Sequence, residues 1–293
     1  LKLSSAPFIT QIISFFVLPF ITRAYSPELF GVFNLISSSA AFLSVFACMG
    51  FDQAVVLPEK DDEGISLFQV SIFSTLIIST LTLAILPLFR SYIYTEDVKV
   101  ISEYIYFIPL LVLIAGLYSS FLAINIRMSN FGSISFGRVI NVILNKGFIL
   151  LASTLYISSV YSLLYGYILG FVALVTILIY SSITENNKLW VAHNNYAKLI
   201  RTYKKFPIYI ISNDLLFRGK KVLVAFLIVY FFSSEDAGQY TIALMILALP
   251  TTLIGSSLNE VFYKKIATYT GEESDIKFKS ATLRLFKASL LIL

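Results

Sequence analysis

The sequence predicts an all-α integral membrane protein. Hydrophobic residues make up 57% of its 293 positions and charged residues 13%, whereas a soluble domain carries roughly a quarter charged residues. Several apolar runs reach the ~20 residues that a helix needs to cross a bilayer. None of them shows the polar–apolar alternation of a barrel strand. A polytopic helical protein satisfies all three observations.

Composition also excludes several kinds of chemistry. Cys48 is the only cysteine and His193 the only histidine, so neither an intramolecular disulfide nor a thiolate or histidine metal site is expected. We expect no cofactor. The net charge of +5 does not indicate nucleic acid, because the basic residues fall mainly in the loops of one membrane side. The expected surroundings are the lipid bilayer.

Apolar runs bounded by turn residues predict eight complete helices and the start of a ninth near Phe278. The chain opens and stops within apolar runs, and we therefore expect a fragment of a longer protein. In order, the eight predicted helices are Ser4–Thr22, Leu29–Gly50, Ile65–Phe89, Glu103–Ile124, Phe131–Ile157, Val160–Ser182, Pro207–Phe232 and Ala237–Tyr263.

Lysine and arginine set the predicted orientation, because short cytoplasmic loops are enriched in both. One set of loops holds most of them, including the basic segment Thr184–Phe206, which we expect to lie along the anionic inner leaflet. The opposite set holds only Arg23, Arg90 and Lys99. The N-terminus is therefore expected in the cytoplasm.

A short motif occurs twice, as "YSPELFGVF" at 25–33 and "FSSEDAGQY" at 232–240. The copies lie 233 − 26 = 207 residues apart, with six predicted helices between them. An even number gives both copies the same direction, so we expect a parallel repeat about an axis along the membrane normal. Such lobes usually enclose a substrate path, which favours a transporter. The matched residues are Ser26, Glu28, Gly31 and Phe33 with Ser233, Glu235, Gly238 and Tyr240.

The seventh predicted helix carries the most embedded charge. A helix that began after Lys221 would leave residues 222–232, about half the length of a span. The helix must therefore begin near Pro207, a residue suited to a first turn. It then embeds four charged residues, three of which share one face by their spacing. The four are Asp214, Arg218, Lys220 and Lys221.

Two other predicted helices add polar groups at corresponding depth. The repeat sets Arg218 and Lys221 against Gln11 and Ser14 of the first helix. Together with the fifth helix these residues predict a cationic, amide-lined lumen for an anionic ligand that carries sugars. Guanidinium groups fork onto phosphate oxygens, and amides bond hydroxyl groups. The fifth helix contributes Arg138, Asn141, Asn145 and Lys146.

Several of these residues have a second interpretation. Asp214 is either a coupling acid for an ion gradient or a structural i, i+4 partner of Arg218. Lys146 and Lys220 could instead extend toward the membrane surface or settle in contacts between helices, and Arg138 could be an interfacial anchor. We expect Asp52, at a helix end, to be solvated.

Three segments give the chain a resemblance to the polysaccharide transporter family, the Wzx-type O-antigen and repeat-unit flippases of the multidrug/oligosaccharidyl-lipid/polysaccharide (MOP) exporter superfamily. The resemblance covers nearly the whole chain, although the charge at positions 218–221 is denser than the family pattern. The segments are "QIISFFVLPFITRAYSPELFGVFNL", "FDQAVVLPEKDDEG" and "DAGQYTIALMILALPTTLIGSSLNEVFY".

This resemblance implies two parallel six-helix lobes and alternating access in a bacterial inner membrane. Residues 1–182 would form the first lobe, 183–206 a cytoplasmic linker, and 207–293 the start of a truncated second lobe. The implied cargo is a polyprenyl-pyrophosphate-linked oligosaccharide, moved from the cytoplasmic to the outer leaflet. A glycan polymerase complex is an implied partner, and no enzymatic activity is expected.

Two other functions remain open. A drug/cation antiporter of the same superfamily would share the fold, but organic cations call for an acidic or aromatic lumen. A polytopic glycan polymerase or glycosyltransferase would normally show a large extramembrane loop or paired acids at a membrane face. The sequence shows neither feature.

Overall fold

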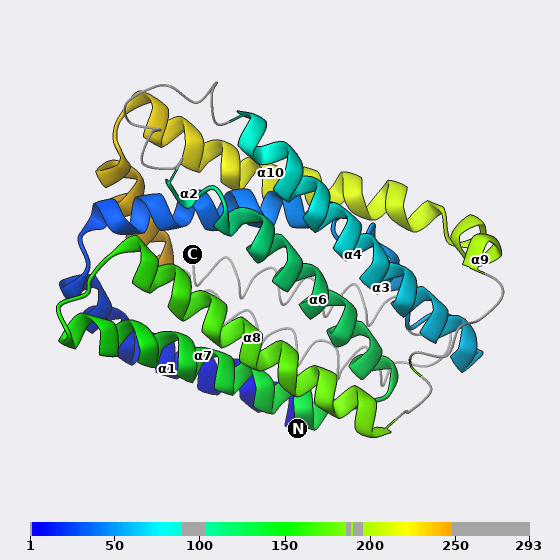
Figure 1. Cartoon of the computed structure of the whole chain (residues 1–293). Coiled ribbons are helices and arrows are strands. Elements are labelled where there is room, and N and C mark those ends of the chain that lie inside the picture. The colour runs from blue at the N-terminus through cyan, green and yellow to red at the C-terminus, as the bar shows by residue number, and fades with distance from the viewer. Residues whose placement is uncertain (1, 90–102, 186–188, 190–195, 248–293) are drawn as a thin grey trace, which may run out of the picture. The chain divides into compact units, whose positions relative to one another are not determined.

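The computed structural model describes residues 2–89, 103–185, 189 and 196–247, and all regular structure in these residues is helical. Three short helices are η1 (Ser44–Phe46), α3 (Phe51–Ala54) and α9 (Tyr196–Thr202), and residues 234–247 are also helical. The long helices (Figure 1) are α1 (Lys2–Ala24), α2 (Pro27–Leu43), α4 (Asp61–Phe89), α6 (Phe107–Arg127), α7 (Phe131–Thr154), α8 (Val160–Glu185) and α10 (Lys205–Phe231).

Among the described helices, six are long and apolar enough to cross a membrane, namely α1, α2, α4, α6, α7 and α8. They match the first six predicted helices to within a few residues at most ends. The seventh, α10, runs unbroken for 27 residues through all its charged positions. The prediction of one continuous helix through these charged positions is therefore confirmed, whereas their place within the membrane stays a prediction. The eighth predicted helix beyond residue 247, and the ninth, lie outside the described residues.

The second predicted helix ends earlier than expected. We predicted Leu29–Gly50, but α2 stops at Leu43 and is followed by η1 and the short α3. Gly50 caps α3 with a φ of 71°, a left-handed conformation that glycine adopts without steric cost. A side chain there would also press against Phe206 and Ile210 of α10. The turn therefore brings α3 against the start of α10.

The helices pack in a defined order within the compact unit Leu1–Ala243. Helix α7 packs against α1 and α8, and α6 packs against α4 and α8. Helix α10 lies along α2, and its first part also contacts α3 (Figure 1). Residues Leu244–Leu293 form a second unit.

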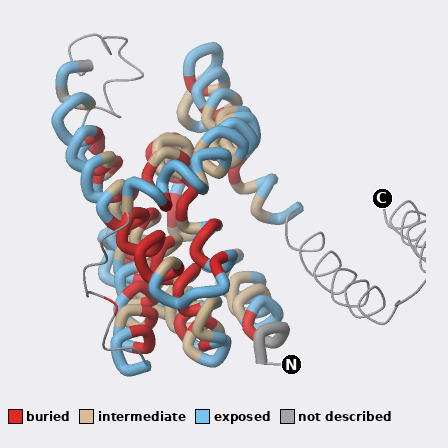
Figure 2. Tube along the Cα trace, turned by 90° about the vertical axis from the view of Figure 1, so that its right-hand side faces the viewer, coloured by how far each residue is buried: buried red, intermediate tan, exposed pale blue. Residues whose placement is uncertain are grey.

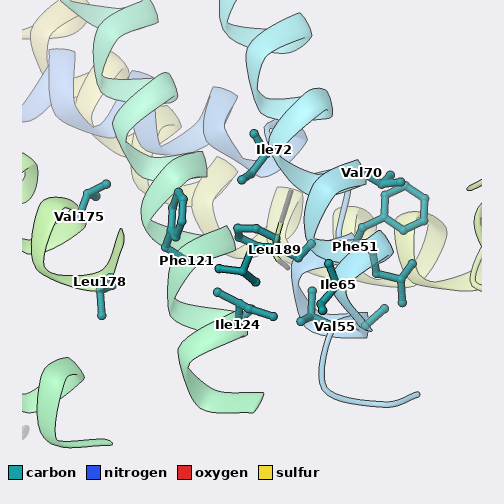
Figure 3. Close-up of a cluster of buried hydrophobic side chains, with 14 of the residues drawn as sticks. Phe51, Val55, Ile65, Val70, Ile72, Phe121, Ile124, Val175, Leu178 and Leu189 are labelled. Carbon is teal, nitrogen blue, oxygen red and sulfur yellow. The ribbon is translucent and has the colours of Figure 1, made fainter. Parts of the chain in front are cut away.

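The largest buried cluster joins α3, α4, α6 and α8 (Figure 3). Leu189, from the segment between α8 and α9, inserts among these helices and is fully buried. The Gln69 amide of α4 donates to the Leu189 carbonyl oxygen at 2.7 Å, and Tyr196 donates to Gln69 at 2.6 Å. Outward-facing residues of the long helices are exposed (Figure 2), as a lipid-facing surface would be. The linker is thus anchored to the first six helices.

The helix ends reproduce the repeat found in the sequence. Helix α1 ends at Ala24 and α10 at Phe231, which are 231 − 24 = 207 residues apart. Helix α2 begins at Pro27, and the next helix after α10 begins at 234, which gives 234 − 27 = 207. The offset that aligns the two motifs therefore also aligns the ends of the helices around them.

Candidate functional site

Arg218 of α10 reaches across to the C-terminal end of α2. Its Nη1 donates to the Ala41 carbonyl oxygen at 3.1 Å and to the Ser44 hydroxyl at 2.8 Å. The last carbonyl groups of a helix lack intrahelical partners and carry the negative end of its dipole. The guanidinium group therefore satisfies the end of α2 while remaining attached to α10.

The Asp214–Arg218 pair exists but is long. Arg218 Nη2 lies 3.5 Å from Asp214 Oδ2, and the side chains are 39% and 28% exposed for Arg218 and Asp214 respectively. A contact of this length and exposure contributes little stability. Nη2 therefore retains the capacity to bind a stronger acceptor.

Lys220 and Lys221 lie on the exposed side of α10. Both ammonium groups approach the Phe217 ring, with Nζ 4.8 Å and 5.3 Å from its centroid. These distances are within the range of cation–π attraction. Of the cations predicted on α10, Arg218 contacts α2, whereas the two lysines extend outward beside an aromatic ring.

Asp52 of α3 joins the electrostatic surroundings of Arg218, a role that the sequence did not predict. Burial raises the pKa of its carboxyl group, and hydrogen bonds from the backbone N–H groups of residues 53 and 52 oppose the rise; the Asp214 charge adds to the rise and the Arg218 charge opposes it. Asp52 is half-buried, whereas the sequence predicted a solvated side chain. The turn at Gly50 folds α3 back toward α10, and no local sequence pattern marks that contact. Burial also raises the pKa of Cys48 to about 12, so this thiol stays protonated.

The polar residues predicted on α7 lie in a different part of the fold. A Cβ added at Gly170 of α8 would meet the Asn141 carbonyl oxygen and the Asn145 Cβ, so both asparagines lie where α7 and α8 approach closely. Arg138 and Lys146 are half-buried on the same helix. Gln11 is half-buried on α1, which packs against α7. The predicted polar residues of α7 therefore lie on a helix that packs against α1 and α8, whereas Arg218 lies at the α2–α10 contact.

Arg127, at the C-terminal end of α6, makes contacts that sequence reasoning missed. Its Nη1 donates to the Val55 and Pro58 carbonyl oxygens, and its Nη2 to Asp61 Oδ1, all at 2.9 Å. The side chain is 11% exposed. It borders a cavity of about 240 Å³ together with Asp61 and Glu185. Arg127 therefore fixes the α3–α4 connection to α6.

A larger cavity of about 650 Å³ opens between the start of α7 and the end of α8. Its lining is mixed, with Phe136 and Tyr180 beside Ser133, Thr184 and Glu185. The residues predicted for the lumen do not line it. In the described part of the chain, no group of three or more histidine, cysteine or carboxylate side chains could hold a metal ion.

Comparison with known proteins finds a matching family model and a solved structure with a similar fold. The family model described as "Polysaccharide biosynthesis protein" matches residues 20–293. A search of curated proteins finds no match. A solved multidrug resistance MATE family transporter of the MOP superfamily, in an inward-facing conformation, is similar with a TM-score of 0.64 and 18% identity. The match covers 100% of this chain and 68% of that one, and at this identity it shows the fold alone.

Proposed function

Because this chain belongs to the family of polysaccharide biosynthesis proteins and has the fold of a MOP-superfamily transporter, we propose that it is a flippase. Its cargo is a polyprenyl-pyrophosphate-linked oligosaccharide, such as an O-antigen or capsular repeat unit. Alternating access moves this cargo from the cytoplasmic to the outer leaflet of a bacterial inner membrane. A glycan polymerase complex receives the product.

The position of Arg218 carries this proposal. Arg218 carries a half-exposed guanidinium group on a continuous helix that is long enough to span a bilayer. It lies where this helix contacts α2, a helix of the other copy of the repeat. A pyrophosphate is a stronger acceptor than the Ala41 carbonyl or the Ser44 hydroxyl, because bonds between ionised groups are about twice as strong as neutral ones. Binding of the head group would therefore release Arg218 from α2. That exchange links cargo binding to movement of α10 relative to α2.

The remaining predicted residues take supporting roles in the proposal. Lys220 and Lys221 add positive charge near Phe217 and would attract the head group from the bilayer surface. Gln11, Asn141 and Asn145 would bond sugar hydroxyls, with Arg138 and Lys146 beside them as further cations. Asp214 is the proposed coupling acid. The protein needs no covalent chemistry for this task and carries the glycan unchanged.

The orientation follows from the charged loops. Lys198 and Arg201 of α9 are exposed, as are Lys204 and Lys205 at the start of α10. Placed at the cytoplasmic surface, these side chains would face anionic lipid head groups, each with a favourable contribution of about 1 kcal/mol. The N-terminus then lies in the cytoplasm, and Ser26 and Ser233 both lie at the outer side.

A drug/cation antiporter is the second candidate, because the similar solved structure is a multidrug transporter. The charges argue against it. Helix α10 holds three embedded cations and one acid between positions 214 and 221, which disfavours an organic cation. A membrane glycan polymerase or glycosyltransferase is favoured by no observed contact.

The test uses the full-length protein in cells that depend on it for export of a lipid-linked glycan. Arg218→Ala should reduce export by roughly ten- to a hundred-fold, because loss of a charge-assisted phosphate contact costs about 1.5–3 kcal/mol. Arg218→Lys should be partly active, since lysine keeps the charge but not the fork. Arg23→Ala, which removes an exposed arginine on the opposite side, is the matched control.

A double variant separates ligand binding from structural pairing. If Arg218 merely neutralised Asp214, then Asp214→Asn with Arg218→Gln should restore export, because both charges disappear together. The flippase proposal expects no restoration. Full export by Arg218→Ala, at normal protein levels in the membrane, would remove the basis for a phosphate site here.

A further inference from the structure

The two copies of the repeated motif touch each other through their glycines. A Cβ added at Gly31 would collide with the Ser234 carbonyl oxygen, and one added at Gly238 would collide with the Pro27 carbonyl oxygen. Both collisions are with backbone atoms, which cannot move aside as a flexible side chain can. Only glycine at both positions permits so close an approach of two helices.

The contact is reciprocal under the 207-residue offset. Position 27 corresponds to 234, and 31 corresponds to 238, so the first turn of each helix meets the glycine of the other. A residue pair that recurs with its roles exchanged is the mark of an interface across a two-fold axis. The two repeats therefore meet at a self-complementary crossing made by Pro27–Gly31 and Ser234–Gly238.

Apolar packing continues below the crossing. Leu35, one turn further along α2, is buried in a cluster with Ala225, Val229 and Ala237. This contact is made by apolar side chains, in contrast to the contact between Arg218 and the other end of α2. The head group of a ligand could replace the hydrogen-bond partners of Arg218. It could not replace the close backbone contact at the helix crossing. The two ends of α2 therefore make contacts of different kinds with the second copy of the repeat.

We propose that the crossing of Pro27–Gly31 with Ser234–Gly238 is the outer gate of the transport path. This inference rests on the proposed function and orientation, which put the starts of both helices at the outer side. When the two helices meet, glycine allows them to close without a gap. In the outward-open state they separate, and Leu35 becomes accessible to water from outside. Residues 31 and 238 thus set how tightly the path closes.

The test measures accessibility and needs no cargo. In intact cells, Leu35→Cys is treated with a membrane-impermeant maleimide, with the parent chain as the blank because Cys48 is buried. Labelling of the Leu35→Cys variant should be slow. It should be about tenfold faster when Gly31→Ala or Gly238→Ala is added, because the added methyl group overpacks the closed crossing and shifts the equilibrium toward the outward-open state. Gly147→Ala is the control, because a Cβ there meets nothing within 4 Å.

Equal labelling rates in the Gly31→Ala, Gly238→Ala and Gly147→Ala backgrounds would overturn the gate. Labelling from inverted vesicles but not from cells would instead show that the orientation is reversed, which contradicts an outer gate while leaving the flippase chemistry intact. Should the glycine variants fail to reach the membrane, Glu28→Cys with Glu235→Cys provides a second route. A reducible bifunctional reagent that joins these equivalent exposed positions should stop export until it is cleaved, and undiminished export by the tethered protein contradicts the gate.

Discussion

Two arginines at helix contacts show how differently the same side chain can be used. Arg127 donates three bonds of 2.9 Å and is 11% exposed. Arg218 makes two comparable bonds to α2 and a third at 3.5 Å, and it is 39% exposed. The donors of Arg127 therefore serve to hold a connection in place. Arg218 keeps donors and solvent access that a ligand could use.

The partners of the two residues sharpen this difference. Arg127 binds two backbone carbonyls in the bend between α3 and α4, a segment with no regular structure of its own to satisfy them. Arg218 binds Ala41 and Ser44 at the end of a helix that belongs to the other copy of the repeat. One contact stays within the first six helices, whereas the other joins the two copies of the repeat. The two arginines thus differ in burial and in the elements that they connect.

The largest expected effect comes from Arg127→Ala. It leaves the Val55 and Pro58 carbonyls without their donor and should reduce the free energy of unfolding by about 2–4 kcal/mol. Arg218→Ala should reduce the free energy of unfolding by less than about 1 kcal/mol, although the proposed function expects it to abolish most export. Thermal unfolding in detergent, with binding of purified lipid-linked glycan measured in parallel, distinguishes the two.

Arg127→Lys is the sharper form of the same experiment. A single ammonium group cannot reach three acceptors arranged around a planar fork, so lysine should restore little stability at 127. At 218 it should restore part of the export. If lysine rescued position 127 as well as it rescued 218, the distinction between the two sites would be contradicted.

The fold was predictable from the sequence because membrane-spanning helices appear as long apolar runs and an internal duplication appears as a motif repeated at a fixed offset. Apolar length predicted helices, six of which are long and apolar enough in the structure to cross a membrane. The offset of the motif copies predicted helix ends that recur 207 residues apart. The continuous α10 followed from a length argument alone. The role of Arg127 did not follow, because its carbonyl partners lie 72 and 69 residues away and carry no side-chain signature.

The candidate site was predictable in its residues but not in their grouping. Spacing placed Asp214 and Arg218 on one face, and the structure pairs them. Spacing could not reveal that Arg218 binds the end of α2, 174 residues away, or that Asn141 and Asn145 lie against Gly170 of α8. Helix-to-helix contacts depend on packing angles and on small residues, and periodicity within one helix specifies neither.

The carboxylates beside the two arginines give the next largest effect. The Asp61 side chain is 84% exposed, so Asp61→Asn should change the free energy of unfolding by well under about 1 kcal/mol, as exposed ion pairs typically do. Asp214 is mostly covered, and Asp214→Asn should reduce ion-driven export by about tenfold with little loss of stability. Wild-type export by Asp214→Asn, at equal protein levels, would contradict its role as the coupling acid.

The smallest expected effect concerns Asp52, whose pKa depends in part on the charges of Asp214 and Arg218. Burial raises the pKa of its carboxyl group above the usual 3.8, so the folded protein holds this proton more tightly than the unfolded chain does. Stability from this group is then present at low pH and is lost as the pH rises through the interval above 3.8. Asp52→Asn removes the ionised form, and the second copy already carries Asn259 at the equivalent position, since 52 + 207 = 259.

The Asp52→Asn variant should therefore unfold at a slightly higher temperature than the parent at pH 7, and the difference should shrink as the pH falls toward about 4. Arg218→Gln should enlarge the difference, because the positive charge that opposes the rise in the pKa of Asp52 is gone. A lower unfolding temperature for Asp52→Asn at pH 7 would instead mean that the backbone N–H donors of residues 52 and 53, together with the Arg218 charge, stabilise the Asp52 carboxylate more than burial penalises it.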